Sequence, residues 1–82
     1  MGRAILSFDA WTQVVAERLS LNKADLDRAA SAPEVLARRP VEVMSFVAVM
    51  SDLGVEFSYE DVSGLATVGD AYREYAFRLI AP

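Results

Sequence analysis

Few side chains in this 82-residue chain could take part in catalysis or bind a metal ion. The chain contains no His and no Cys, so the commonest general base, the commonest metal ligand and every thiolate nucleophile are absent. Asp, Glu, Tyr and the single lysine, Lys23, remain for such roles. They show no metal-ligand spacing and no nucleophile–base–acid set, and the chain has no glycine-rich phosphate loop. The sequence therefore predicts a protein that is not an enzyme and holds no metal.

Composition and charge exclude some classes of binding partner. Hydrophobic residues make up 54% of the chain and charged residues 24%, which is typical of a globular domain. Eight basic and twelve acidic residues give a net charge of −4, whereas a nucleic-acid binder needs a basic face. No apolar run reaches the roughly 18 residues of a membrane span, and the first six residues are too short for a secretory signal. We expect one cytoplasmic domain over residues 1–82, with neither nucleic acid nor membrane as partner.

Hydrophobic spacing and helix-start signals predict four helical segments. They run over residues 8–19, with Ser7 or Asp9 as the cap, over 40–53, over 59–62 after Ser58, and onward from Thr67. A connection over 20–39 is long for a small domain, so its apolar residues should anchor it to the core. It should contain one turn after Asn22 and another beginning at Pro33, and its expected anchors are Leu21, Leu26, Val35 and Leu36.

The segment 40–53 is apolar on more than one face. It begins with Pro40 and ends before Gly54, which favours a helix, although its β-branched valines make a strand the rival interpretation. One stripe can face the core: Val43, Phe46, Val49, Met50 and Leu53. A second stripe is left over: Pro40, Val41, Met44, Val47, Ala48 and Ser51. Either a partner covers this second stripe, or the helix phase differs and the long connection covers it.

The order and spacing of several motifs resemble the acyl carrier protein family. The resemblance covers roughly residues 8–80 and is carried mainly by Asp52-Leu53-Gly54-Val55-Glu56-Phe57, Tyr59-Glu60-Asp61-Val62 and Leu65-Ala66-Thr67-Val68-Gly69-Asp70-Ala71. It implies an all-α fold, a four-helix bundle of acyl-carrier-protein type. Such a bundle has three longer helices, one short third helix and a long loop between helices 1 and 2.

The family's attachment site is altered in this chain. Acyl carrier proteins hold 4′-phosphopantetheine on the serine of an Asp-Ser-Leu triplet at the start of the second helix. The resemblance places that triplet on Arg38-Arg39-Pro40, with Arg39 at the serine position. Arginine has no hydroxyl that could form the phosphodiester, so the resemblance implies a pseudo-carrier without this cofactor. The alternative is a working carrier that is modified at a non-standard serine, Ser45.

A pseudo-carrier of this kind would act through its surface. We expect helix 40–53 to bind or scaffold an enzyme of polyketide, fatty-acid or peptide-synthetase biosynthesis, or to bind a second copy of the chain. In the family this helix usually presents several carboxylates, whereas here Glu42 and Asp52 are its only charges. The expected partner-binding residues are Arg38, Arg39, Pro40, Val41, Met44, Val47, Met50 and Ser51. The two arginines could instead be an ordinary solvated pair.

Two further groups have plainer expected roles. The aromatic residues Trp11, Tyr72, Tyr75 and Phe77 are expected to pack in the core. The acidic residues Glu56, Glu60 and Asp61 are expected to form a solvated face, or else a patch that steers a basic partner.

Overall fold

Polar side chains fix where the helices begin. In the computed structural model, which describes residues 4–80, α1 (Phe8–Leu19) follows Ser7, whose Oγ accepts a hydrogen bond from the Ala10 N–H at 3.1 Å. At the start of α5 (Val68–Ile80), Thr67 Oγ1 accepts from the Asp70 N–H at 3.0 Å. Each bond satisfies a backbone donor that the helix itself leaves unpaired. The predicted starts of both helices are confirmed, with Ser7 as the cap of the first.

The segment with the rival strand interpretation is a helix, α3 (Pro40–Asp52). Pro40 occupies its first position, where a missing N–H costs nothing. Gly54 follows the helix with a φ of 95°, a conformation that other residues adopt only with strain. Residues 4–80 contain no strand, and their single β-type pairing is an isolated bridge between Ser31 and Thr67. The helical prediction is therefore confirmed.

The long connection is ordered by short helices and by buried leucines. It contains the 3-10 helix η1 (Lys23–Asp25), capped by Asn22, and α2 (Ala32–Val35), capped by Ser31. The second of these begins one residue before the predicted Pro33. All four predicted anchors contact the core, two of them buried and two half-buried: Leu26 and Leu36, then Leu21 and Val35. The connection is thus part of the packed structure.

The same connection is also bonded to the start of α5, which the sequence did not predict. The Ala32 N–H donates to the Ala66 carbonyl at 3.0 Å, and the Gly69 N–H donates to the Arg28 carbonyl at 2.9 Å. A Cβ on Gly69 would lie 2.9 Å from that Arg28 oxygen. Only glycine therefore lets these two backbones approach so closely.

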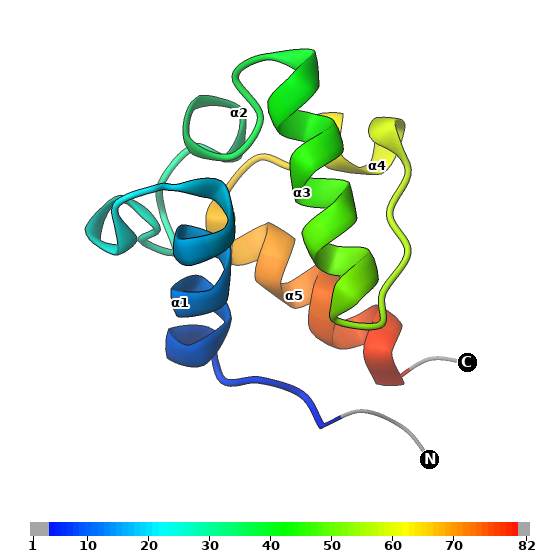
Figure 1. The fold of residues 1–82 in the computed structure, drawn as a ribbon. Helices are drawn as coiled ribbons and strands as arrows, with labels where there is room; N and C mark the ends of the chain where they lie inside the picture. Colours follow the sequence, from blue (N-terminus) through cyan, green and yellow to red (C-terminus); the bar gives the residue numbers. More distant parts are fainter. Residues whose placement is uncertain (1–3, 81–82) are drawn as a thin grey trace.

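The helices pack as an all-α fold, as predicted (Figure 1). In Figure 1 α1 and α3 lie side by side, and α3 also contacts α4 (Tyr59–Ser63). The four predicted helices correspond to α1, α3, α4 and α5. Since α2 is an additional single turn, the helix predicted as the second one is α3.

Aromatic rings fill the core between α1, α3 and α5. Trp11 is fully buried, with its ring 6.2 Å from that of Phe46 and 6.1 Å from that of Tyr75. Tyr72 packs against the same cluster at 5.5 Å from Trp11. The expectation for Phe77 is wrong, because its side chain is 63% exposed. Phe77 lies two positions after Tyr75, which places it on the opposite side of α5.

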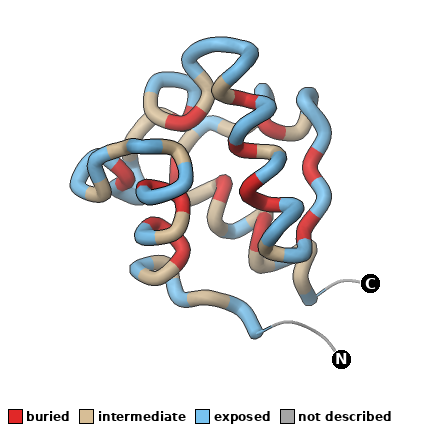
Figure 2. Tube along the Cα trace, in the orientation of Figure 1, coloured by how far each residue is buried: buried red, intermediate tan, exposed pale blue. Residues whose placement is uncertain are grey.

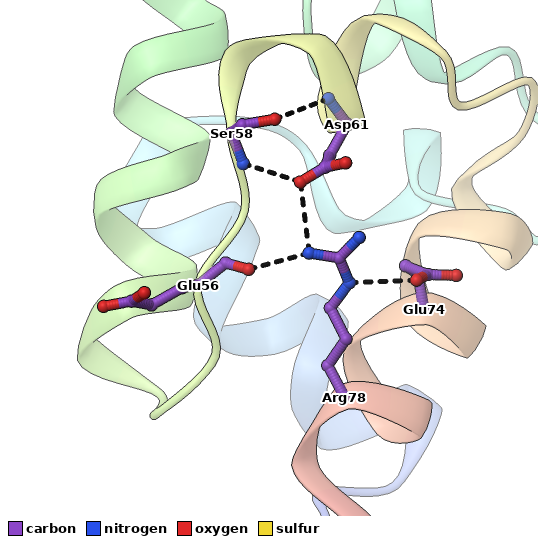
Figure 3. A network of polar contacts seen from close by, with 5 residues as sticks. All are labelled: Glu56, Ser58, Asp61, Glu74 and Arg78. Atoms are coloured by element: carbon purple, nitrogen blue, oxygen red, sulfur yellow. Dashed lines mark hydrogen bonds and ion pairs between the residues drawn. The ribbon is translucent and has the colours of Figure 1, made fainter. Parts of the chain in front are cut away.

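A polar network joins α4 to α5 (Figure 3). Asp61 Oδ2 accepts hydrogen bonds from the Ser58 N–H at 2.8 Å and from Arg78 NH1 at 3.1 Å. Arg78 also donates to Glu74 Oε1 at 2.9 Å and to the Glu56 carbonyl at 2.8 Å. Glu56 and Glu60 are exposed and the Asp61 side chain is 36% exposed, which agrees with the expected solvated face. The sequence did not predict that the Asp61 carboxylate also connects the short helix α4 to α5.

The hydrogen bonds in this network stabilise its charged forms. The bond from the Ser58 N–H, followed by that from Arg78, lowers the pKa of Asp61 to about 2. The bonds to Glu74 and then to Asp61 raise the pKa of Arg78. Both groups are therefore ionised wherever the protein is folded near neutral pH.

Candidate functional site

The outer face of α3 is exposed. Val41 is 61% exposed and Met44 is 53% exposed, and these are the two large apolar side chains of the face. Figure 2 shows buried and exposed positions alternating along this helix. Pro40, Ala48 and Ser51 are exposed as well, while Val47 is half-buried against the core. The long connection does not cover this second stripe, so the helix phase expected from the sequence is confirmed.

Met50 does not belong to this surface. Its side chain is fully buried, although we expected it among the partner-binding residues. Met50 follows Phe46 by four positions and Val43 by seven, and residues at these spacings share one helix face. That face is the core face of α3, which Val43 and Phe46 also occupy. Met50 is therefore a packing residue, and the exposed outer face of α3 consists of Pro40, Val41, Met44, Ala48 and Ser51.

Arg39 is the N-cap residue of α3, and its side chain makes no capping bond. Its Nε instead donates to Glu42 Oε2 at 3.0 Å. The other oxygen of the same carboxylate, Oε1, accepts from the backbone N–H of Arg38 at 2.9 Å. Glu42 thus reaches back to the residue before the cap, much as the acidic residue of a capping box reaches back to the cap itself. It also places a negative charge in the first turn, where the helix dipole favours one.

These contacts determine the ionisation of Glu42. Desolvation acts to raise the pKa of its carboxyl group, but the hydrogen bonds from the Arg39 side chain and the Arg38 backbone outweigh it and lower that pKa below its usual value. The Arg39–Glu42 pair is therefore charged at neutral pH. We did not predict this ion pair from the sequence. The signal that could have revealed it is the spacing of three residues, which brings two side chains together on a helix.

Arg38 carries a positive charge that no carboxylate neutralises. Its guanidinium donates to the Glu34 backbone carbonyl at 3.4 Å, and in residues 4–80 it takes part in no ion pair. Since the charge of Glu42 is already matched by Arg39, this end of α3 has one positive charge in excess. At the other end, Asp52 pairs with Arg18 at 2.6 Å. The excess positive charge of the outer face thus lies at the end where Arg38 stands.

Two hollows adjoin Arg39. One has a volume of about 310 Å³ and lies between the end of α1 and the start of α3; Leu19, Leu36, Val41 and Ser45 are among the residues that line it. The other has a volume of about 140 Å³ and lies toward α4, where Tyr59 and Val62 line it. Tyr59 is 45% exposed, and we did not predict it as part of the surface. Arg39 therefore stands between two depressions that a protruding partner side chain could enter.

Ser45 lies on the second turn of α3. Its Oγ is exposed and donates to the Val41 carbonyl at 2.9 Å, a bond within the helix. It is the one serine in the middle of this surface, but it is not at the helix start. The residue at the helix start is Arg39, which offers no hydroxyl.

No group among residues 4–80 combines three acidic side chains in a way that could hold a metal ion. Over the same residues, no helix is both long enough and apolar enough to cross a membrane.

No protein-family model matches the chain, and no solved structure gives a significant match to it. The resemblance to acyl carrier proteins therefore stays a prediction from the sequence.

Proposed function

We propose that this chain is an acyl-carrier-protein-like pseudo-carrier, a non-catalytic subunit that binds or scaffolds a biosynthetic enzyme through α3. The enzyme class is one that normally meets carriers in polyketide, fatty-acid or peptide-synthetase biosynthesis. The observation that carries the proposal is the start of α3, where a guanidinium bonded to Glu42 occupies the position expected for the attachment serine. No cofactor is part of this function.

The residues at this position do not fit a phosphopantetheine group. Its attachment requires an oxygen nucleophile that attacks the β-phosphate side of the coenzyme A diphosphate, and Arg39 has none. The carboxylate of Glu42 lies beside the same point, at 3.0 Å from the Arg39 guanidinium. Glu42 is thus paired with the arginine that stands in place of the attachment serine.

The exposed apolar residues support binding as the function. Val41 and Met44 remain more than half exposed in the folded chain, and each could contribute about 1–2 kcal/mol if a partner buried the rest of it, before the costs of association. Residues of this kind at the centre of a surface are typical interface residues. The basic end beside them can orient an acidic partner surface.

Modification at Ser45 is the alternative function, and one observation favours it. The Ser45 hydroxyl is exposed and lies at the edge of the 310 Å³ hollow. Against it stands the bond to the Val41 carbonyl, which a phosphate ester would remove. In that case the chain would be a working carrier with 4′-phosphopantetheine on an unusual serine.

One experiment separates the two functions. The purified chain and its Ser45→Ala variant are incubated with coenzyme A and a promiscuous phosphopantetheinyl transferase, and intact masses are recorded beside an active carrier as positive control. A pseudo-carrier should show no mass change in either chain. A gain of one phosphopantetheine that Ser45→Ala abolishes would establish the alternative and overturn the pseudo-carrier.

A further inference from the structure

We infer that the outer face of α3 also pairs with the same face of a second copy of this chain, with the two helices antiparallel. The inference rests on the exposed surface used for the proposed function, but not on the identity of any enzyme. Because both partners use one face, self-association and enzyme docking would compete.

The sizes of the exposed side chains along α3 point to an antiparallel pair. The large side chains Val41 and Met44 stand in its first half, and the small ones Ala48 and Ser51 stand in its second half. Their spacing of three, four and three residues is that of a helix–helix seam. In an antiparallel pair centred at the level of Phe46, position 44 faces position 48 and position 41 faces position 51. Each large side chain then meets a small one.

A parallel pair would not have this complementarity. Met44 would face Met44 of the partner subunit, and Ala48 would face another alanine, which leaves the second half of the seam open. Close packing requires the gap opposite a small side chain to be filled by a large one. The antiparallel arrangement satisfies this requirement at both ends at once, as a two-fold symmetric interface must.

The charges favour the same orientation. Arg39 pairs with Glu42, while the guanidinium of Arg38 is in no ion pair with the residues that the structure describes, so the first end of α3 carries one positive charge in excess. The second end carries the Arg18–Asp52 pair together with the partial negative charge of a helix C-terminus. Antiparallel pairing places each positive end beside this second end, whereas parallel pairing would place four arginines together. Like charges brought together oppose association.

The size of the face indicates a weak, reversible dimer. α3 has 13 residues, so the seam is about 20 Å long and about 10 Å wide. A stable interface buries about 1,200 Å² or more in total, and one helix face of these dimensions supplies less. The dimer should therefore form at high protein concentration and dissociate on dilution.

Sedimentation equilibrium over a wide concentration range tests for the dimer. The wild-type chain should show a reversible monomer–dimer equilibrium. Met44→Glu should raise the dissociation constant by about tenfold or more, which corresponds to about 1.4 kcal/mol. Phe77→Glu, which changes an exposed apolar residue on α5, should leave the dissociation constant unchanged. Circular dichroism verifies that both variants keep their helices, which the exposure of both residues predicts.

Cysteine cross-linking tests the orientation, because the chain has no native cysteine. The variants Met44→Cys and Ala48→Cys are oxidised gently, each alone and as an equimolar mixture. Antiparallel pairing predicts that the mixed disulfide dominates and that each variant alone forms little dimer, since a disulfide needs Cα atoms within about 7 Å. Preferential homodimer disulfides, or a statistical mixture, would contradict the antiparallel pair.

The two proposals fail separately in these experiments. A wild-type chain that stays monomeric at all concentrations overturns the dimer and leaves the pseudo-carrier intact. A dimer that Met44→Glu does not weaken also overturns the inference, because it must form through another surface. Pantetheinylation in the transferase experiment overturns the pseudo-carrier without touching the dimer.

Discussion

Arg78 and Asp61 form an ion pair between α5 and the first turn of α4, with NH1 of the arginine 3.1 Å from Oδ2 of the aspartate. The same carboxylate oxygen accepts from the Ser58 N–H. This ionised side chain therefore helps to hold α4 on the fold, together with Val62, which is buried in the core. Tyr59 and Val62 of α4 line one of the hollows beside Arg39. The Arg78–Asp61 ion pair therefore also supports the surface around Arg39.

Acid should destabilise the protein through Asp61. Its pKa in the folded chain is about 2, against an ordinary value of 3.8. A carboxyl group with a lowered pKa contributes stability above its unfolded-state value, and that contribution is lost as the pH falls from about 4 to about 2. Urea unfolding across this range should show the loss in the wild-type chain and a smaller one in Asp61→Asn. If the free energy of unfolding falls equally steeply with pH in both chains, other carboxyl groups govern the acid sensitivity.

Gly69 should not tolerate a side chain. A Cβ at this position would lie 2.9 Å from the Arg28 carbonyl oxygen, so Gly69→Ala must push the two backbone segments apart. We expect a loss of about 1–3 kcal/mol in the free energy of unfolding. The matched control is Gly64→Ala, whose nearest contact would be an ordinary 3.5 Å and whose φ of −87° suits alanine. That variant should be neutral or slightly stabilising. If both variants unfold at the same urea concentration, the close approach is not a structural constraint.

Two methionines of α3 should respond oppositely to truncation. Met50 is fully buried, whereas Met44 is 53% exposed. Met50→Ala should therefore cost about 2–5 kcal/mol, and Met44→Ala should stay within about 0.5 kcal/mol of the wild-type chain. Chemical denaturation at low protein concentration measures both values without contributions from self-association. A large loss for Met44→Ala would mean that the outer face is packed after all.

Arg28 should stabilise the fold through aromatic contacts. Its guanidinium carbon lies 4.1 Å from the Phe8 ring centroid and 5.6 Å from that of Tyr72. Arg28→Gln should lower the free energy of unfolding by about 0.5–1 kcal/mol. Arg73→Gln is the control, because its side chain is 82% exposed and lies 3.8 Å from Asp70. If thermal unfolding shows the same loss of stability in both variants, the change in net charge and not the loss of ring contacts is the cause.

The sequence was sufficient for the features that arise within one helix. Spacing along α3 separated the buried Phe46 from the exposed Met44, and caps such as Ser7 and Thr67 marked the helix starts. In the sequence, Met50 fits both the core stripe and the partner-binding surface of α3. Its spacing of four residues from Phe46 assigns it to the core stripe. The sequence thus predicted helix order and phase from local physics.

Features that depend on distant residues were missed. Asp61 looked like one of several solvated carboxylates because its partner, Arg78, lies 17 positions away. The contact of Gly69 with Arg28 likewise joins segments that no local pattern connects. Glu42 is an intermediate case, since its pairing with Arg39 follows from a spacing of three residues. What the sequence could not supply was therefore the tertiary partner of each polar side chain.

Binding to a carrier-dependent enzyme tests the pseudo-carrier function most directly. Enzymes from polyketide, fatty-acid and peptide-synthetase assembly are titrated with the wild-type chain, with Met44→Glu and with Phe77→Glu, and affinity is measured by calorimetry. We predict that at least one enzyme binds the unmodified wild-type chain, that Met44→Glu weakens this binding about tenfold or more, and that Phe77→Glu does not. Binding that requires a pantetheinylated chain, or that is insensitive to Met44→Glu, would contradict a pseudo-carrier that docks through α3.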